Sequence, residues 1–162
     1  MTARRVVIGL GTSARGDDAV GLHVARKVAA AAPAGVVVII APGDPLALLD
    51  RWDAEDEVVL VDAAASLGMP GRVHRLDPVA APLPPDLRMA STHAFGFAAT
   101  VELARVLGRL PARLTIFAIE GATFAVGAAL SPAVARAADA LAARIVAGCA
   151  RARRNVPEPA DH

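Results

Sequence analysis

Short apolar runs, rich in β-branched residues, alternate along this chain with longer alanine-rich stretches, and this alternation limits the possible folds more than any other feature of the sequence. Apolar runs of about 4–8 residues are typical of buried strands, whereas the alanine-rich stretches have the spacing of helices. Regular alternation of the two predicts an α/β layer fold. The predicted strands are Val6–Leu10, Val36–Ile40, Val58–Asp62, Arg72–Leu76 and Thr115–Ile119.

One predicted strand differs from the others. Arg72–Leu76 alternates in polarity, whereas three of the remaining strands are nearly continuous apolar runs, as expected for strands covered on both faces. It also follows the Pro70-Gly71 turn closely. We therefore expect a short edge strand here and consider an antiparallel direction for it.

The first helix is expected to begin near Asp17 or Asp18 and to end before Pro33. Its apolar stripe recurs every four residues, which is the spacing of a buried helix face. Further helices are predicted from Pro45 to Trp52, after Ser91-Thr92, and after Ser131-Pro132, and a surface loop is predicted over Pro78–Arg88.

Length and hydropathy fit a single domain over residues 1–150, followed by a flexible tail at 151–162. Hydrophobic residues form 55% of the chain, but the longest uncharged run, residues 28–43, contains Pro33, Gly35 and Pro42. A spanning helix needs about 20 unbroken apolar residues, so we expect no membrane partner.

Charge and cysteine content exclude other classes of protein. The formal net charge is +1 and aromatic residues form only 3% of the chain, so neither a phosphate-binding surface nor a set of base-stacking rings is expected, and nucleic acid is not a predicted partner. The single cysteine, Cys149, rules out an internal disulfide or a cysteine-cluster metal site and favours a cytoplasmic location.

The glycine-rich segment from Gly9 to Gly21 follows a predicted strand and opens a helix. A dinucleotide-binding turn would need a third glycine where this chain has Ala14, and two acids, Asp17 and Asp18, stand where a phosphate would bind. Like charges would repel, so nucleotide binding is rejected. The remaining alternatives are a helix cap or a ligand pair of carboxylates.

Two further polar residues stand at positions where ligands bind in α/β proteins. Asp62 ends a run of four apolar strand residues and so lies at the carboxyl edge of the sheet, although it could also cap a turn. His93 lies in the first turn of a predicted helix, where the positive end of the helix favours the neutral imidazole that a metal ligand requires. An ordinary surface histidine is the alternative.

If the core of the sheet is parallel, the loops that carry the two acids and the histidine meet at one edge. Two carboxylates and one imidazole would form a nitrogen and oxygen ligand set suited to Zn²⁺, Ni²⁺ or a similar divalent transition metal. Three protein ligands leave coordination positions open, so this would not be a closed structural site.

These residues and their order resemble the hydrogenase maturation endopeptidases. Members have a segment like G-N-P-L-R-G-D-D-G-V-G, a strand ending in V-D-A, a P-G turn, a segment like S-S-H-x-x-G, and L-S-P before the last helix. The corresponding segments here are Gly11-Thr-Ser-Ala-Arg-Gly-Asp-Asp-Ala-Val-Gly21, Val61-Asp62-Ala63, Pro70-Gly71, Ser91-Thr-His-Ala-Phe-Gly96 and Leu130-Ser131-Pro132.

The resemblance implies a three-layer α/β/α sandwich around a five-stranded, mostly parallel mixed sheet. It also implies that Asp18, Asp62 and His93 are the metal-ligating and catalytic residues. The implied activity is removal of a C-terminal peptide from the precursor of a nickel–iron hydrogenase large subunit, once nickel has been inserted. In this reading the metal is the nickel carried by the substrate, and it serves as the recognition element.

The chain departs from the family pattern in two places. Thr12, Ala14 and Ala19 replace the motif's asparagine, leucine and glycine. After the second strand, many members carry an acid with glycines that is implicated in substrate recognition, whereas this chain has Ala41-Pro-Gly-Asp-Pro45. A non-catalytic metal-binding or metallocentre-assembly protein on the same fold is the alternative function, and an ordinary α/β domain whose acids and histidine are caps is a third.

Overall fold

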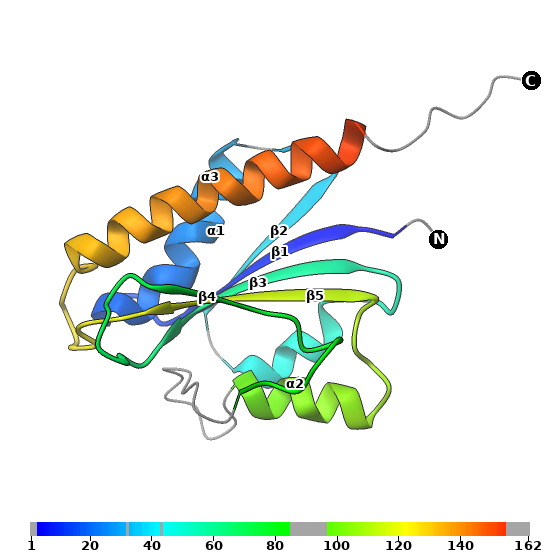
Figure 1. The fold of residues 1–162 in the computed structure, drawn as a ribbon, viewed down its shortest axis with the longest axis horizontal. Coiled ribbons are helices and arrows are strands. Elements are labelled where there is room, and N and C mark those ends of the chain that lie inside the picture. Colours follow the sequence, from blue (N-terminus) through cyan, green and yellow to red (C-terminus); the bar gives the residue numbers. More distant parts are fainter. Residues whose placement is uncertain (1–2, 32, 43, 85–96, 155–162) are drawn as a thin grey trace, which may run out of the picture.

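The computed structural model describes residues 3–31, 33–42, 44–84 and 97–154, and shows a five-stranded sheet with helices on both faces (Figure 1). The strand order is β2-β1-β3-β5-β4. Four strands are parallel, and β4 at the edge runs antiparallel to β5, as its polarity and the preceding turn suggested. The strands are β1 Arg5–Gly11, β2 Val36–Pro42, β3 Glu57–Ala64, β4 Val73–Leu76 and β5 Arg113–Glu120.

Helices complete the two outer layers, so the predicted three-layer α/β/α sandwich is confirmed. Two of them, α1 (Val20–Ala31) and α3 (Pro132–Arg154), pack together on one side of the sheet, here called the α1/α3 face. The opposite side, the α2 face, carries α2 (Phe97–Val106) and the 3-10 helix η2 (Pro45–Asp50).

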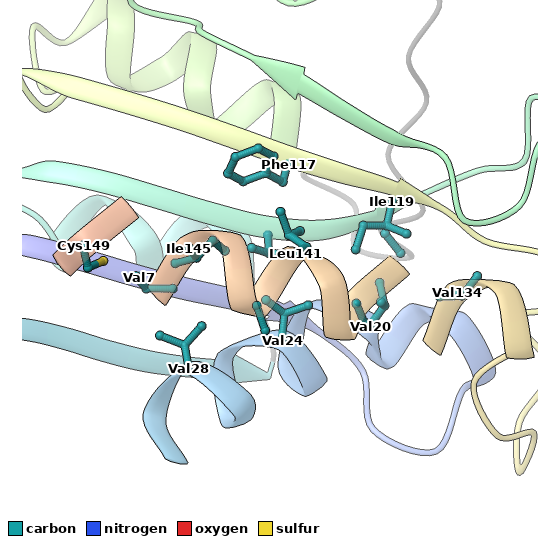
Figure 2. Packing of buried hydrophobic residues seen from close by; sticks show 14 residues of the cluster. Val7, Val20, Val24, Val28, Phe117, Ile119, Val134, Leu141, Ile145 and Cys149 are labelled. Atoms are coloured by element: carbon teal, nitrogen blue, oxygen red, sulfur yellow. The ribbon is translucent and has the colours of Figure 1, made fainter. Parts of the chain in front are cut away.

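Alternating side chains of each central strand fill two apolar layers. On β3, Val61 and Ala63 join the cluster under α1 and α3 (Figure 2), whereas Val58 and Leu60 join the cluster under α2 and η2. Because successive strand residues point to opposite faces, Asp62 belongs to the α2 face together with Leu60.

Two glycines let α1 lie directly against the sheet. A Cβ atom at Gly21 would stand 2.2 Å from the Leu10 carbonyl oxygen and 2.3 Å from that of Val61. A Cβ atom at Gly9 would stand 2.1 Å from the Gly21 oxygen. The helix axis is therefore held close to β1 and β3, which places the residues just before α1 over the carboxyl ends of both strands.

The structure corrects some predicted boundaries. The first helix begins as a 3-10 turn, η1 (Gly16–Ala19), which contains both aspartates, before α1 starts. Helix α3 continues through Arg154, so residues 151–154 are helical and the tail does not begin at Arg151 as predicted. Its alanine and arginine residues are good helix formers, which explains the extension. Residues 155–162 lie outside the described ranges.

Among the helices of the described ranges, none combines the length and apolar composition needed to cross a bilayer.

Candidate functional site

The two neighbouring aspartates of η1 have different environments. Asp17 is fully buried, and its carboxylate accepts hydrogen bonds from the amides of Ala122 (2.7 Å), Thr123 (3.0 Å) and Ser131 (2.7 Å) and from the Ser131 hydroxyl (2.7 Å). Burial opposes its ionisation, but these bonds hold its pKa below the ordinary value. Asp17 therefore fastens the segment between β5 and α3 to η1 and has no oxygen free for a ligand.

Asp18 is also buried, but it has few partners. Its Oδ2 accepts a hydrogen bond from the Thr12 amide (3.1 Å), and within the described ranges its other oxygen has no donor. The turn that carries it depends on Gly11, where φ is +151° and a Cβ atom would stand 2.1 Å from the Asp18 carbonyl oxygen. The Thr12 amide and the Gly11 turn thus fix the position of this carboxylate.

Asp62 occupies the end of β3 that sequence analysis assigned to it. It is 4% exposed, and its Oδ1 accepts a hydrogen bond from the Ala63 amide (2.8 Å). Burial raises the pKa of Asp62 to about 7, the Ala63 amide opposes the shift, and the negative charge of Asp18 adds to it. The structure thus brings Asp18 and Asp62 together at the carboxyl edge of the parallel strands.

The third predicted ligand, His93, lies outside the described residues, as does the rest of the segment that leads into α2. Helix α2 begins at Phe97 and covers the face of the sheet to which Asp62 belongs. Within the described ranges no group of three or more histidine, cysteine, aspartate or glutamate residues is arranged to hold a metal. The role of His93 stays a prediction.

A further buried acid, Glu120, was not predicted from the sequence. It ends β5 and is fully buried. Its carboxylate accepts hydrogen bonds from the amides of Leu67 (2.7 Å) and Met69 (3.3 Å), and its Oε2 lies 2.8 Å from His74 Nε2. Burial opposes ionisation, but His74 and the two amides hold its pKa below the ordinary value. Glu120 therefore orders the loop after β3, next to the edge that carries Asp62.

The signal for Glu120 was present. Like Asp62, it directly follows an apolar strand run, Thr115–Ile119, and the same argument about strand ends applies to it. Its partner could not be found in the same way, because His74 stands on an antiparallel edge strand whose register depends on the intervening loop.

Comparisons with known proteins identify a family and a fold. The sequence profile described as "HycI: Hydrogenase maturation protease" matches residues 22–148. No curated protein sequence gives a significant match.

Solved structures share the fold. The hydrogenase maturating endopeptidase HybD from E. coli is 22% identical, with a TM-score of 0.72 over 92% of this chain and 93% of that one. A [NiFe] hydrogenase maturation protease, HycI from Thermococcus kodakarensis KOD1, is 23% identical, with a TM-score of 0.71 over 90% and 91%. Since the family profile matches well over half of the sequence, the chain belongs to the hydrogenase maturation proteases, hydrolases that cleave peptide bonds.

Proposed function

We propose that this protease removes the C-terminal extension from the precursor of a nickel–iron hydrogenase large subunit after nickel insertion. In this proposal Asp18, Asp62 and His93 bind the nickel that the substrate carries, and the reaction takes place in the cytoplasm. The observation that supports it is the pair of buried carboxylates, Asp18 and Asp62, close together at the carboxyl edge of the sheet.

The chemistry of this pair favours a cation. The pKa of Asp62 is raised to about 7 by burial and by the neighbouring charge of Asp18, so ionising both acids is costly in the absence of a positive charge. A divalent ion between them would offset the repulsion and displace the Asp62 proton. With an imidazole added, the ligand set would suit nickel or zinc.

The neighbouring acids would support recognition without touching the ion. Asp17 fixes the segment after β5, and Glu120 fixes the loop after β3, so both of these segments are held by partly buried hydrogen bonds. A precursor that binds through its nickel would therefore contact loops that are already ordered. Such positioning supplies several kcal/mol toward a reaction, of the order seen when reacting groups are held in place.

The test is to incubate the purified protein with nickel-loaded and with metal-free precursor and to measure loss of the C-terminal peptide by mass spectrometry. Cleavage should occur on the loaded precursor only. Asp18→Asn should reduce the rate by about a hundredfold or more, because one of the two acids is lost. Asp139→Asn is the matched control: it removes the same charge from an exposed carboxylate of α3 that pairs with Lys27 and His23 of α1, and it should leave the rate unchanged.

Equal cleavage of the two precursor forms would refute recognition through nickel. Tight nickel transfer with no loss of mass would instead favour the non-catalytic metal-binding alternative, to which the altered residues Thr12 and Ala41 give modest support.

A further inference from the structure

A concave site lies on the α1/α3 face of the sheet, opposite the face to which Asp62 belongs. A cavity of about 410 Å³ opens between the C-terminal half of α3 and strands β3, β4 and β5. Four of the described residues that line it are arginines, and they come from three separate elements of the fold: Arg5 from β1, Arg75 from β4, and Arg144 and Arg151 from α3. Among the described lining residues none is acidic.

Most of this positive charge is not neutralised by the described residues. Arg5 pairs with Glu57 (2.8 Å) and donates a hydrogen bond to the Cys149 carbonyl oxygen (3.3 Å). By contrast, Arg75, Arg144 and Arg151 have no carboxylate partner anywhere in residues 3–31, 33–42, 44–84 or 97–154. A chain with a net charge of only +1 thus gathers, at one cavity, three guanidinium groups that have no carboxylate partner among the described residues.

The helix dipole explains only part of this arrangement. Basic residues near the end of α3 are favoured by its negative C-terminal end. That effect does not account for Arg75, which reaches the same cavity from the antiparallel edge strand. Arginines that converge on one cavity from a helix and from a sheet are typical of an anion-binding site. The low-dielectric walls of a cleft also concentrate the electric field of the charges that line it.

The cavity also has an apolar side. Val59, Phe117 and Ile145 contribute to its lining, and the Arg144 guanidinium carbon lies 5.9 Å from the centroid of the Phe117 ring. Figure 2 shows Phe117 and Ile145 as members of the same apolar cluster. Stacking of this kind orients a guanidinium while leaving its N–H groups available.

We propose that this cavity binds a small organic anion that carries at least two negative charges on carboxylate or phosphate groups. Guanidinium forks match the oxygen geometry of both groups, and the apolar side would contact a short carbon skeleton. Its volume lies within the range of about 300–1,000 Å³ found for small-ligand sites. The site faces α3, whereas Asp62 faces α2, so the two proposals can fail independently.

The test is calorimetric titration of the full chain at low ionic strength with pyrophosphate and, separately, with citrate. The two ligands distinguish phosphate from carboxylate recognition. Saturable one-to-one binding of either should weaken about tenfold or more when Arg75, Arg144 and Arg151 are all changed to Gln, since charge-assisted bonds are lost. Changing Arg26, Arg51 and Arg136 to Gln alters the net charge equally at exposed positions and should leave the affinity within about twofold.

Equal weakening by the two triple variants would overturn the site, since it would mean that only net charge matters. A double variant, Glu158→Gln with Asp161→Asn, removes the two acids that follow α3 in the sequence and so removes possible competitors for the arginines. An absence of saturable binding in both the wild type and this double variant would also overturn the proposal. Binding of a poly-glutamate peptide but of neither small anion would replace the proposal with a protein-docking surface.

Discussion

Asp18 lies near enough to Asp62 for its negative charge to help raise the pKa of the Asp62 carboxyl group to about 7. Burial is the larger cause, and the amide of Ala63 opposes both effects. Two acids that follow different strands in the sequence are thus electrostatically linked. This linkage predicts how the protein responds to pH, to substitution and to cations.

The stability of the metal-free protein should depend on the protonation of Asp62. Because its pKa is higher in the folded than in the unfolded chain, the folded state binds this proton more tightly. The resulting stabilisation is complete below about pH 4, the unfolded value, and is lost as the pH rises through about 7. A shift of about three pKa units corresponds to a change on the order of 4 kcal/mol.

Asp62→Asn removes that dependence. Urea unfolding at a series of pH values, with chelator present, should show the variant gaining stability relative to the wild type from pH 4 to pH 8. Acids that do not interact with Asp62 titrate equally in both proteins and cancel in the difference. A constant difference across this range would contradict the raised pKa.

Replacing Asp17 should lower the free energy of unfolding by a large amount. Asp17→Ala leaves three amides and a hydroxyl without their acceptor in a buried place, which should cost about 3–5 kcal/mol. Ser131→Ala removes the hydroxyl alone and should cost about 1–2 kcal/mol. Chemical denaturation measures both, and similar losses for the two variants would show that the carboxylate is not the organising group.

Two helical glycines should respond to alanine in opposite directions. At Gly21 the added methyl group would meet backbone oxygens at 2.2 and 2.3 Å, so α1 would have to move away from the sheet, at a cost of about 3 kcal/mol or more. At Gly148, in α3, nothing lies within 4 Å of the added atom, and helix propensity should stabilise the protein by up to about 1 kcal/mol. Thermal unfolding of the two alanine variants should show a lower melting temperature for the Gly21 variant and a higher one for the Gly148 variant.

Cys149 should have no nucleophilic role. The residue is buried, and burial raises the pKa of its thiol above the ordinary value, with Arg5 opposing the shift. Cys149→Ser should therefore cleave the precursor at the wild-type rate, and iodoacetamide should neither label the folded protein quickly nor inhibit it. Rapid labelling with loss of activity would contradict this assignment.

The sequence predicted the fold well because the strands are central and buried. Continuous apolar runs such as Val58–Asp62 have few other interpretations, and the polarity of Arg72–Leu76 revealed the one edge strand that reverses direction. The ends of the helices were predicted less accurately than the strands. The 3-10 form of η1 depends on hydrogen bonds from residues about a hundred positions away, at Thr123 and Ser131, which no local pattern contains.

The candidate site was predictable in part. Asp62 followed from its place at the end of a strand, and Asp18 followed from the motif that it shares with the family. The motif did not reveal that the adjacent acid Asp17 has a separate, structural task, because both residues are equally local in the sequence. Nor did it reveal Glu120, whose importance comes from the loop that folds over it.

The register of β3 limits where this chain can gain or lose residues. Asp62 reaches the α2 face only because it shares the parity of Val58 and Leu60, and β1 and β5 pair with the strand on either side. Adding or deleting one residue between positions 58 and 61 would exchange the two faces and drive a carboxylate into the apolar layer beneath α3. The same change in the preceding turn, at residues 53–56, would leave that parity intact but would displace Asp56, which is buried and accepts hydrogen bonds from Arg4 and from the Asp53 amide. Length variation within the strand should therefore be forbidden by the parity of its side chains, whereas in the turn it is opposed by a local hydrogen-bond network.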